Sequence, residues 1–496
     1  MELAFETRRG KFPVDEGWIQ REMDYWRVPG IAIGIVKEGE EPQTLCRGYR
    51  DIEKKLPFNE DTLFCVASCS KSMTAALLAR LTDEGVLDLD TPVKEIVPKF
   101  KLWDEVASKE TTLRDLLCHR TGLGGYDTLW PGRENRAWLA ERLAYLEPTF
   151  PFRKKAQYSN VLYAVAGYVA EYITGTPWEA LMETYIFWPL GMSRTCCSGS
   201  RMIADFNHAE PYYVRNGAQQ KVPFWNVDQA GPAASVNTTL TDMIRWLQFH
   251  IRGGKTADGT PLLRETLFQQ LHRPHIKYED GAGLPDNCFP ADHYCLGWLS
   301  GRYRGREMQK HSGKIEGYST LQAYLPEEKI GVVIMANLHS PSTPIFYTIC
   351  YTVFDLLLGF HDRDWAAEFH PGGEQAPVEA YLDCDKDYAS RRLTADLEKK
   401  PRSFDLPSYA GCYWNPGFGY VVVEAKEKGL WLHYRDQTLP LRHWGENQFW
   451  MDGVKEDVLT IRVPVIFERR NDGITAVKIG YEERLENIRF IRETPV

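Results

Sequence analysis

The residues best able to do chemistry are Ser68 and Lys71, which stand three positions apart at the expected start of a helix. The run from Met73 to Leu81 is apolar at helical spacing, so the sequence predicts a helix there. Residues three apart share one helix face, and the hydroxyl and the amine can therefore touch. A lysine kept neutral by desolvation can remove the serine proton. The pair is a candidate for covalent catalysis; the alternative is a helix-capping serine followed by a solvated lysine.

Two further segments place polar side chains beside regular elements. Tyr158 and Asn160 come directly before an apolar run at residues 161–173, which predicts a loop-to-helix junction. The triplet at residues 311–313, His-Ser-Gly, precedes residues 318–325, which alternate like a strand. A phenol, an amide and an imidazole can therefore be presented by the ends of three different elements.

The motifs Ser-x-x-Lys, Tyr-x-Asn and His-x-Gly, in this order, resemble those of the serine β-lactamase and penicillin-binding protein superfamily. The closest likeness is to class C β-lactamases, D,D-carboxypeptidases and related esterases and acyltransferases. The resemblance covers roughly residues 15–360 in order. The segments that carry it besides the three motifs are residues 85–93, 112–123, 189–192, 233–243, 296–298 and 331–337.

The resemblance implies roles for three residues. Ser68 is expected to be the nucleophile that holds the acyl group as an ester. A nearby ammonium is expected to lower the pKa of Tyr158, which lets the phenol exchange a proton with the serine and the leaving group. The sequence leaves open whether Lys71 or Tyr158 is the general base. Without the other motifs, a buried core tyrosine is the favoured interpretation of Tyr158.

Substrate-binding residues follow from the same resemblance. Asn160 is expected to orient Lys71 or to bind a substrate amide. His311 stands where many relatives have lysine, and at neutral pH it is expected to be only partly charged. The loss of a permanent cation favours ester, thioester or neutral amide substrates over those with a bound carboxylate. A purely structural histidine is the alternative.

The oxyanion hole and the acyl pocket are also implied by the resemblance. The backbone N–H groups of Ser68 and Lys314 are expected to form the oxyanion hole, with Ser312 and Gly313 lining the site beside them. Tyr126 and Trp225 lie in segments that line the cleft in relatives, so they favour a hydrophobic acyl group or an aromatic substrate. Core or loop-anchoring aromatic residues are the alternative.

The composition of the 496-residue chain is that of a globular protein, with 43% hydrophobic and 26% charged residues. A net charge of −9 argues against nucleic acid as a partner. The most apolar segment, residues 345–360, is short and contains Asp355, so no membrane span is expected. The N-terminus lacks a signal-peptide pattern, and eleven cysteines without tight spacing fit a reducing compartment, which predicts a cytoplasmic protein. No metal or nucleotide motif emerges, so no cofactor is predicted.

The predicted architecture is α/β (α+β), with strands from both ends of residues 1–365 forming an antiparallel sheet flanked by helices, as in the β-lactamase and transpeptidase fold. Residues 366–404 read as a charged connector, partly helical. Residues 405–496 consist of short strands separated by turns, which predicts a small all-β barrel. This last segment resembles the lipocalin-like domain of some relatives. It is expected to be a lid, a dimer contact that makes the protein a homo-oligomer, or a domain for stability alone.

The leading functional hypothesis is a serine hydrolase that acts through a Ser68 acyl-enzyme on an ester, thioester or amide, with a small-molecule or peptide-like acyl substrate. An acyltransferase that passes the acyl group to an alcohol or amine is the first alternative. A catalytically silent, assembly-forming member of the superfamily is the second, although all three motifs are present.

Overall fold

The computed structural model describes residues 6–129, 135–215, 218–278, 291–339, 343–370, 393, 395–435, 437–452, 462–470, 473–482 and 484–493. Its main domain is built on a ten-stranded sheet in the order β1-β3-β2-β14-β13-β12-β11-β10-β9, with β4 beside β3. β2 pairs antiparallel with β14, so the two ends of the domain meet in the sheet. The strands are β1 (Glu6–Arg9), β2 (Gly30–Lys37), β3 (Gln43–Asp51), β4 (Leu56–Pro57), β9 (Ile276–Lys277), β10 (Ala291–Tyr294), β11 (Leu299–Tyr303), β12 (Arg306–Ile315), β13 (Tyr318–Leu325) and β14 (Ile330–Ala336).

Helices cover both faces of this sheet because its central strands are apolar on both sides. Ile31, Ile33 and Ile35 of β2 join one buried cluster with residues of α1 and α13. Gly34 faces the other side, where a Cβ would lie 2.9 Å from the side chain of Ile244 on α11. The glycine therefore lets α11 pack closely on the sheet.

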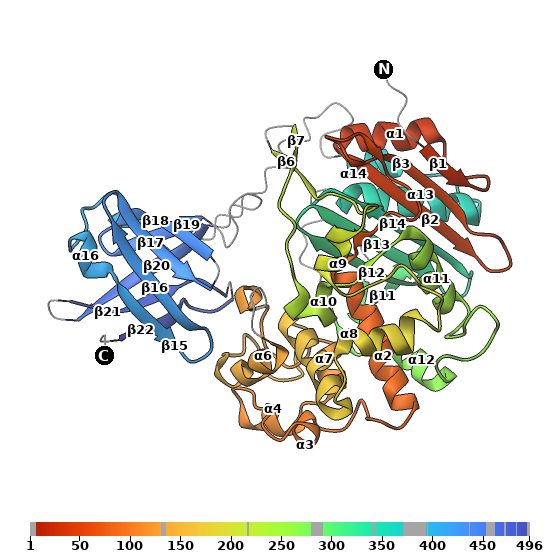
Figure 1. Cartoon of the computed structure of the whole chain (residues 1–496). Coiled ribbons are helices and arrows are strands. Elements are labelled where there is room, and N and C mark those ends of the chain that lie inside the picture. Colours follow the sequence, from red (N-terminus) through yellow and green to blue (C-terminus); the bar gives the residue numbers. More distant parts are fainter. Residues whose placement is uncertain are drawn as a thin grey trace.

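The helix α2 runs through the interior of the main domain, and its buried residues include the polar Ser70, Lys71 and Ser72. The segments from α3 to α7 form a lobe beside the sheet, called the helical lobe below (Figure 1). The principal helices are α1 (Glu16–Tyr25), α2 (Ser70–Asp83), α3 (Val93–Ile96), α4 (Glu105–Glu110), α5 (Leu113–Leu117), α6 (Arg136–Arg142), α7 (Asn160–Thr174), α8 (Trp178–Met182), α9 (Gly199–Ala204), α10 (Gly231–Ala234), α11 (Leu240–Ile251), α12 (Glu265–His272), α13 (Thr343–Leu358), α14 (Trp365–Phe369) and α16 (Leu406–Tyr409).

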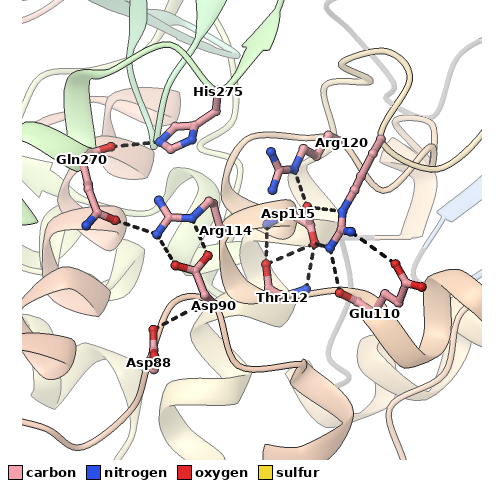
Figure 2. A network of polar contacts seen from close by, with 10 residues as sticks. Asp88, Asp90, Glu110, Thr112, Arg114, Asp115, Arg120, Gln270 and His275 are labelled. Carbon is pink, nitrogen blue, oxygen red and sulfur yellow. Dashed lines mark hydrogen bonds and ion pairs between the residues drawn. The ribbon is translucent and has the colours of Figure 1, made fainter.

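A buried carboxylate organises the base of the helical lobe (Figure 2). Asp115 of α5 has a fully buried side chain and forms ion pairs with Arg120 and Arg153. It also closes a capping box with Thr112, which fixes the start of α5. Burial alone would raise the pKa of the Asp115 carboxyl, but hydrogen bonds from Arg153 and Thr112 and the charge of Arg120 hold it below the ordinary value. The two arginines thereby tie together the loops that follow α5 and precede α7.

The C-terminal domain is a closed barrel in which each strand pairs with the next and β15 pairs with β22 (Figure 1). Its interior is filled by apolar side chains; the rings of Tyr409 and Phe467 lie 5.0 Å apart, and those of Phe449 and Phe467 lie 5.5 Å apart. The strands are β15 (Gly411–Asn415), β16 (Gly419–Lys426), β17 (Gly429–Tyr434), β18 (Gln437–Gly445), β19 (Gln448–Asp452), β20 (Arg462–Arg470), β21 (Gly473–Ile479) and β22 (Ile488–Glu493).

The barrel packs against the helical lobe of the same chain. Arg142 of α6 donates a 3.0 Å hydrogen bond to the backbone oxygen of Pro416, and the Tyr126 and Phe418 rings lie 6.0 Å apart. Buried residues of the two domains belong to one hydrophobic cluster. The interface between the two domains is therefore part of the hydrophobic core.

The predicted fold class is confirmed, both for the antiparallel sheet flanked by helices and for the small all-β barrel. The predicted domain boundary at residue 365 coincides with the first residue of α14. The domain boundaries stay predictions. Most of the predicted connector, residues 371–392 and 394, lies outside the described residues. In the part of the chain that the structure describes, no helix is both long and apolar enough to cross a lipid bilayer.

Replacing Asp115 by alanine is expected to lower the free energy of unfolding by about 3 kcal/mol, because it leaves two arginines facing a buried site without their anion. The wild-type carboxylate adds stability above its ordinary pKa of 3.8, and that contribution disappears as the pH falls through its lower folded-state pKa. Urea unfolding at pH 7 and at pH 3 measures both effects.

Glu110→Ala is the matched control, since Glu110 pairs with the same Arg153 but its side chain is 55% exposed. This variant is expected to change the free energy of unfolding by less than about 0.5 kcal/mol. Equal losses in the two variants would contradict the role assigned to the buried carboxylate.

Candidate active site

Ser68 lies on a short 3₁₀ helix, η1 (Ala67–Cys69), that leads directly into α2. The preceding residue, Ala67, has a φ of 46°, in the left-handed region that alanine rarely adopts. This strained turn is held on both sides: Ser70 donates a 2.6 Å hydrogen bond to the Ala67 carbonyl, and the N–H of Val66 donates to the Val236 carbonyl at 3.0 Å. The nucleophile candidate therefore sits on a bend that its surroundings impose.

Lys71 touches Ser68, as its spacing predicts. Its Nζ lies 3.0 Å from the Ser68 Oγ, 2.7 Å from the Asn160 Oδ1 and 2.9 Å from the backbone oxygen of Ala233. None of these oxygens carries a formal charge, and the lysine is fully buried. Burial lowers the pKa of Lys71 to about 7, although the charge of Asp127 opposes the shift. A large share of the amine is therefore neutral near physiological pH.

Tyr158 forms a hydrogen bond with the Ser68 hydroxyl, and the Lys71 Nζ lies 4.7 Å from the centre of its ring. The expectation of a lowered tyrosine pKa is overturned here. Burial raises the pKa of Tyr158 well above its ordinary value, and the hydrogen bond with Ser68 only partly offsets this. The phenol is therefore protonated at neutral pH, which makes Lys71 the better placed base of the two.

Asn160 is the first residue of α7 and links Lys71 to a carboxylate. Its Oδ1 accepts from Lys71, while its Nδ2 donates to the Asp127 Oδ1 at 2.9 Å. The predicted orienting role of Asn160 fits this geometry. Asp127, in the short helix η2 (Asp127–Leu129), was not among the expected site residues, because nothing in the spacing of the motifs points to it.

His311 is buried on β12 and is uncharged. Its Nδ1 donates to the Ser312 carbonyl at 2.7 Å, so its Nε2 accepts a hydrogen bond from the Tyr294 hydroxyl at 3.0 Å. Burial and then the charge of Lys71 lower the pKa of His311 to about 3. The expectation of a partly charged ring at neutral pH is therefore corrected to a neutral one. Its ring centre lies 6.4 Å from that of Tyr158.

Gly313 brings the backbone of β12 against Ser68, the candidate nucleophile. A Cβ at this position would collide with the backbone oxygen of Val66 and lie 3.1 Å from the backbone nitrogen of Ser68. Only glycine permits this approach. Ser312 beside it is half-buried and the Lys314 side chain is exposed, and the expected roles of these two residues in the site stay predictions.

The two predicted aromatic residues lie differently. Tyr126 is fully buried, its hydroxyl donates to the Glu147 carbonyl at 2.6 Å, and its ring faces the barrel. It is therefore a core residue, and the expectation that its side chain lines a substrate cleft is corrected. Trp225 is partly buried and packs against the main hydrophobic cluster.

His119 is a second imidazole at the site to which the sequence assigned no role. It is fully buried, its ring centre lies 4.6 Å from that of Tyr158, and its Nδ1 accepts the N–H of Ser159 at 3.2 Å. Burial, followed by the charge of Lys71, lowers its pKa well below the ordinary value. The uncharged rings of His119 and His311 therefore lie beside the Tyr158 ring. Among the described residues, no group of three or more His, Cys, Asp or Glu side chains is arranged to hold a metal ion.

Comparisons with known proteins identify the family. The sequence profile described as "Beta-lactamase" matches residues 16–345. The chain belongs to the beta-lactamase family. A second profile, a domain of unknown function (DUF3471), matches residues 396–492, the segment that forms the barrel. The prediction of a lipocalin-like domain there stays a prediction.

Three known proteins are similar to this chain over two thirds of its length or more. An unguisins hydrolase of Aspergillus violaceofuscus is 28% identical over 454 residues, which cover 84% of this chain and 78% of the relative. The octameric penicillin-binding protein homologue from Pyrococcus abyssi matches with a TM-score of 0.58 and 22% identity, over 96% of this chain and 99% of its own. A D-amino acid amidase from Ochrobactrum anthropi matches with a TM-score of 0.55 and 22% identity, over 69% and 97%. The family places the chain among serine hydrolases and leaves its substrate open.

Replacing Gly313 by alanine is expected to lower kcat/KM for an activated ester about 100-fold, because β12 must move away from the Ser68 backbone to make room for the methyl group. Steady-state hydrolysis of a p-nitrophenyl ester measures the change.

Gly429→Ala is the control, since a Cβ at Gly429 meets no atom within 4 Å and its φ is not positive. It is expected to keep wild-type kcat/KM. Wild-type activity in Gly313→Ala would show that close approach of β12 to the nucleophile is unnecessary.

Proposed function

We propose that the protein hydrolyses ester and amide bonds through an acyl-enzyme on Ser68. The observation that carries the proposal is the buried Lys71 amine, 3.0 Å from the Ser68 Oγ and with a pKa lowered to about 7. A neutral amine in this position accepts the serine proton as the Oγ forms a bond to the acyl carbon. The two remaining amine hydrogens are donated to Asn160 and Ala233, which hold the lone pair toward the serine.

The protonated Tyr158 supplies the other half of the proton transfer. Its phenol, hydrogen-bonded to Ser68, gives a proton to the leaving alcohol or amine as the acyl–leaving-group bond breaks, and the Lys71 ammonium restores that proton. The backbone N–H groups of Ser68 and Lys314 are the proposed donors to the developing oxyanion. Water then attacks the Ser68 ester with the same groups in reversed roles, which releases the acid and regenerates the hydroxyl.

The neutral site favours an uncharged acyl substrate. His311 carries no charge at neutral pH, so the position beside the nucleophile offers no fixed cation for a substrate carboxylate. Neutral amides and esters suit this environment better than penicillins or peptides ending in a carboxylate. The name of the unguisins hydrolase supports a hydrolytic reaction, and that of the amidase supports an amide as the bond that is cleaved.

The nucleophile is tested with p-nitrophenyl acetate and butyrate. Wild-type protein is expected to release nitrophenol and to show a transient mass increase of one acyl group, whereas Ser68→Ala shows neither. Intact-mass spectrometry during turnover detects the adduct. Equal nitrophenol release from the two proteins, with no adduct, would assign the activity to another residue.

The base is tested by the pH dependence of kcat/KM. Because Lys71 must be neutral to accept a proton, activity is expected to fall as the pH decreases through about 7, the pKa to which burial lowers the amine. Rates measured from pH 5 to 9.5, corrected with Ser68→Ala at each pH, give the apparent pKa. A rate that does not fall between pH 8 and pH 5 would contradict Lys71 as the base.

A further inference from the structure

One loop of the barrel reaches the active-site region at two points. It joins β21 to β22 and contains Glu482 and Arg484. The Glu482 Oε2 accepts the backbone N–H of Tyr126 at 2.9 Å, and the Arg484 Nη1 donates to the Gln157 Oε1 at 2.6 Å. The two contacted residues directly precede Asp127 and Tyr158 in sequence. A single loop therefore touches both segments that carry side chains to the nucleophile.

The contact made by Glu482 is buried, since this residue is only 6% exposed. Gly124 leaves room for the carboxylate, because a Cβ on Gly124 would lie 2.9 Å from the carboxyl carbon of Glu482. The bound residue, Tyr126, has a φ of 48°, a left-handed conformation that is unfavourable for tyrosine. The carboxylate therefore stabilises a backbone turn that the local sequence disfavours.

That turn aims Asp127 at the catalytic amine. The Asp127 Oδ1 accepts from the Asn160 Nδ2 at 2.9 Å, and the Asn160 Oδ1 accepts from Lys71 at 2.7 Å. On the far side of Asp127, the Leu129 carbonyl accepts a 2.9 Å hydrogen bond from the barrel residue Arg435. The barrel thus holds the backbone on both sides of the carboxylate.

The second contact, between Arg484 and Gln157, holds the backbone next to Tyr158. Gln157 is 2% exposed, its N–H donates to the His119 carbonyl at 2.8 Å, and its Oε1 also accepts from Thr149 at 3.0 Å. Arg484 completes the bonds to this amide oxygen from the barrel side. The backbone that carries Tyr158 is therefore fixed partly by a residue of the other domain.

We propose that Glu482 and Arg484 are positioning residues that set Asp127 and Tyr158 for acyl transfer, so that the barrel completes the active site of its own chain. The proposal rests on the proposed function for its catalytic meaning. It assigns the barrel a part in catalysis, which distinguishes it from a domain that only adds stability.

The pKa of Lys71 distinguishes a positioning role of Glu482 from a role in stability alone. The charge of Asp127 raises the pKa of Lys71 against the effect of burial. If the loss of the Glu482 carboxylate lets Asp127 move away, the lysine loses its proton more readily. The acid limb of the kcat/KM profile then shifts to lower pH, which a loss of folded protein alone cannot produce.

The test compares Glu482→Ala and Arg484→Ala with the conservative variants Glu482→Gln and Arg484→Lys. The alanine variants are expected to lower kcat for p-nitrophenyl acetate at least tenfold with less than a threefold change in KM. Glutamine still accepts the Tyr126 N–H and lysine still reaches Gln157, so these variants are expected to recover to within threefold of wild type. Glu482→Ala also shifts the acid limb to lower pH.

Arg489→Ala is the matched control, because Arg489 pairs with Glu468 at 2.7 Å on the barrel surface and none of its described contacts reaches the helical lobe. It is expected to match wild type in kcat and in pH profile. Thermal unfolding of every variant verifies that the protein remains folded at the assay temperature.

Hydrogen exchange of segments 124–129 and 155–160 gives a readout that needs no activity. Exchange in both segments is expected to rise in the alanine variants and to stay at the wild-type rate in Arg489→Ala. Unchanged exchange, or alanine variants with wild-type kcat, would overturn the positioning role. If the wild type forms no acyl-enzyme, the proposed function fails, while exchange still decides whether the loop positions the two segments.

Discussion

The proposed chemistry of this protein depends on a lysine amine buried among uncharged oxygen atoms. A solvated lysine is an ammonium at neutral pH and cannot accept a proton. Here the Lys71 Nζ contacts a hydroxyl, an amide oxygen and a backbone carbonyl, and burial brings its pKa to about 7. A carboxylate in direct contact would restore the charge, and the structure avoids this by placing Asn160 between Lys71 and Asp127.

Holding the Lys71 amine against the Ser68 hydroxyl requires rigid surroundings. α2 is buried on most sides, the turn at Ala67 is strained, and the backbone of β12 passes so close to Ser68 that Gly313 admits no side chain. Neutral rings of His119 and His311 complete the enclosure. Each of these features lowers the polarity around the amine or fixes its distance from the serine, and each draws on a different part of the chain.

The fold that assembles these parts was largely predictable. Alternating apolar strands at both ends of residues 1–365, with helical periodicity between them, indicate an antiparallel sheet flanked by helices, and that sheet is observed. The short strands and turns after residue 405 indicate a barrel, and it closes through β15 and β22. How the barrel meets the helical lobe was not predictable, because single contacts such as that of Arg142 with Pro416 leave no periodic signal.

The sequence by itself determined the local pairing of Ser68 with Lys71, since a three-residue separation on a helix brings two side chains together wherever that helix lies. Tertiary structure decided what the spacing cannot encode. It buried Tyr158, which raises the phenol pKa where a lowered one was expected. It also placed the Tyr126 side chain in the core and linked Asp127 to Lys71 through Asn160. Protonation depends on the solvent that a folded environment excludes, and burial is a property of the whole chain and of no single motif.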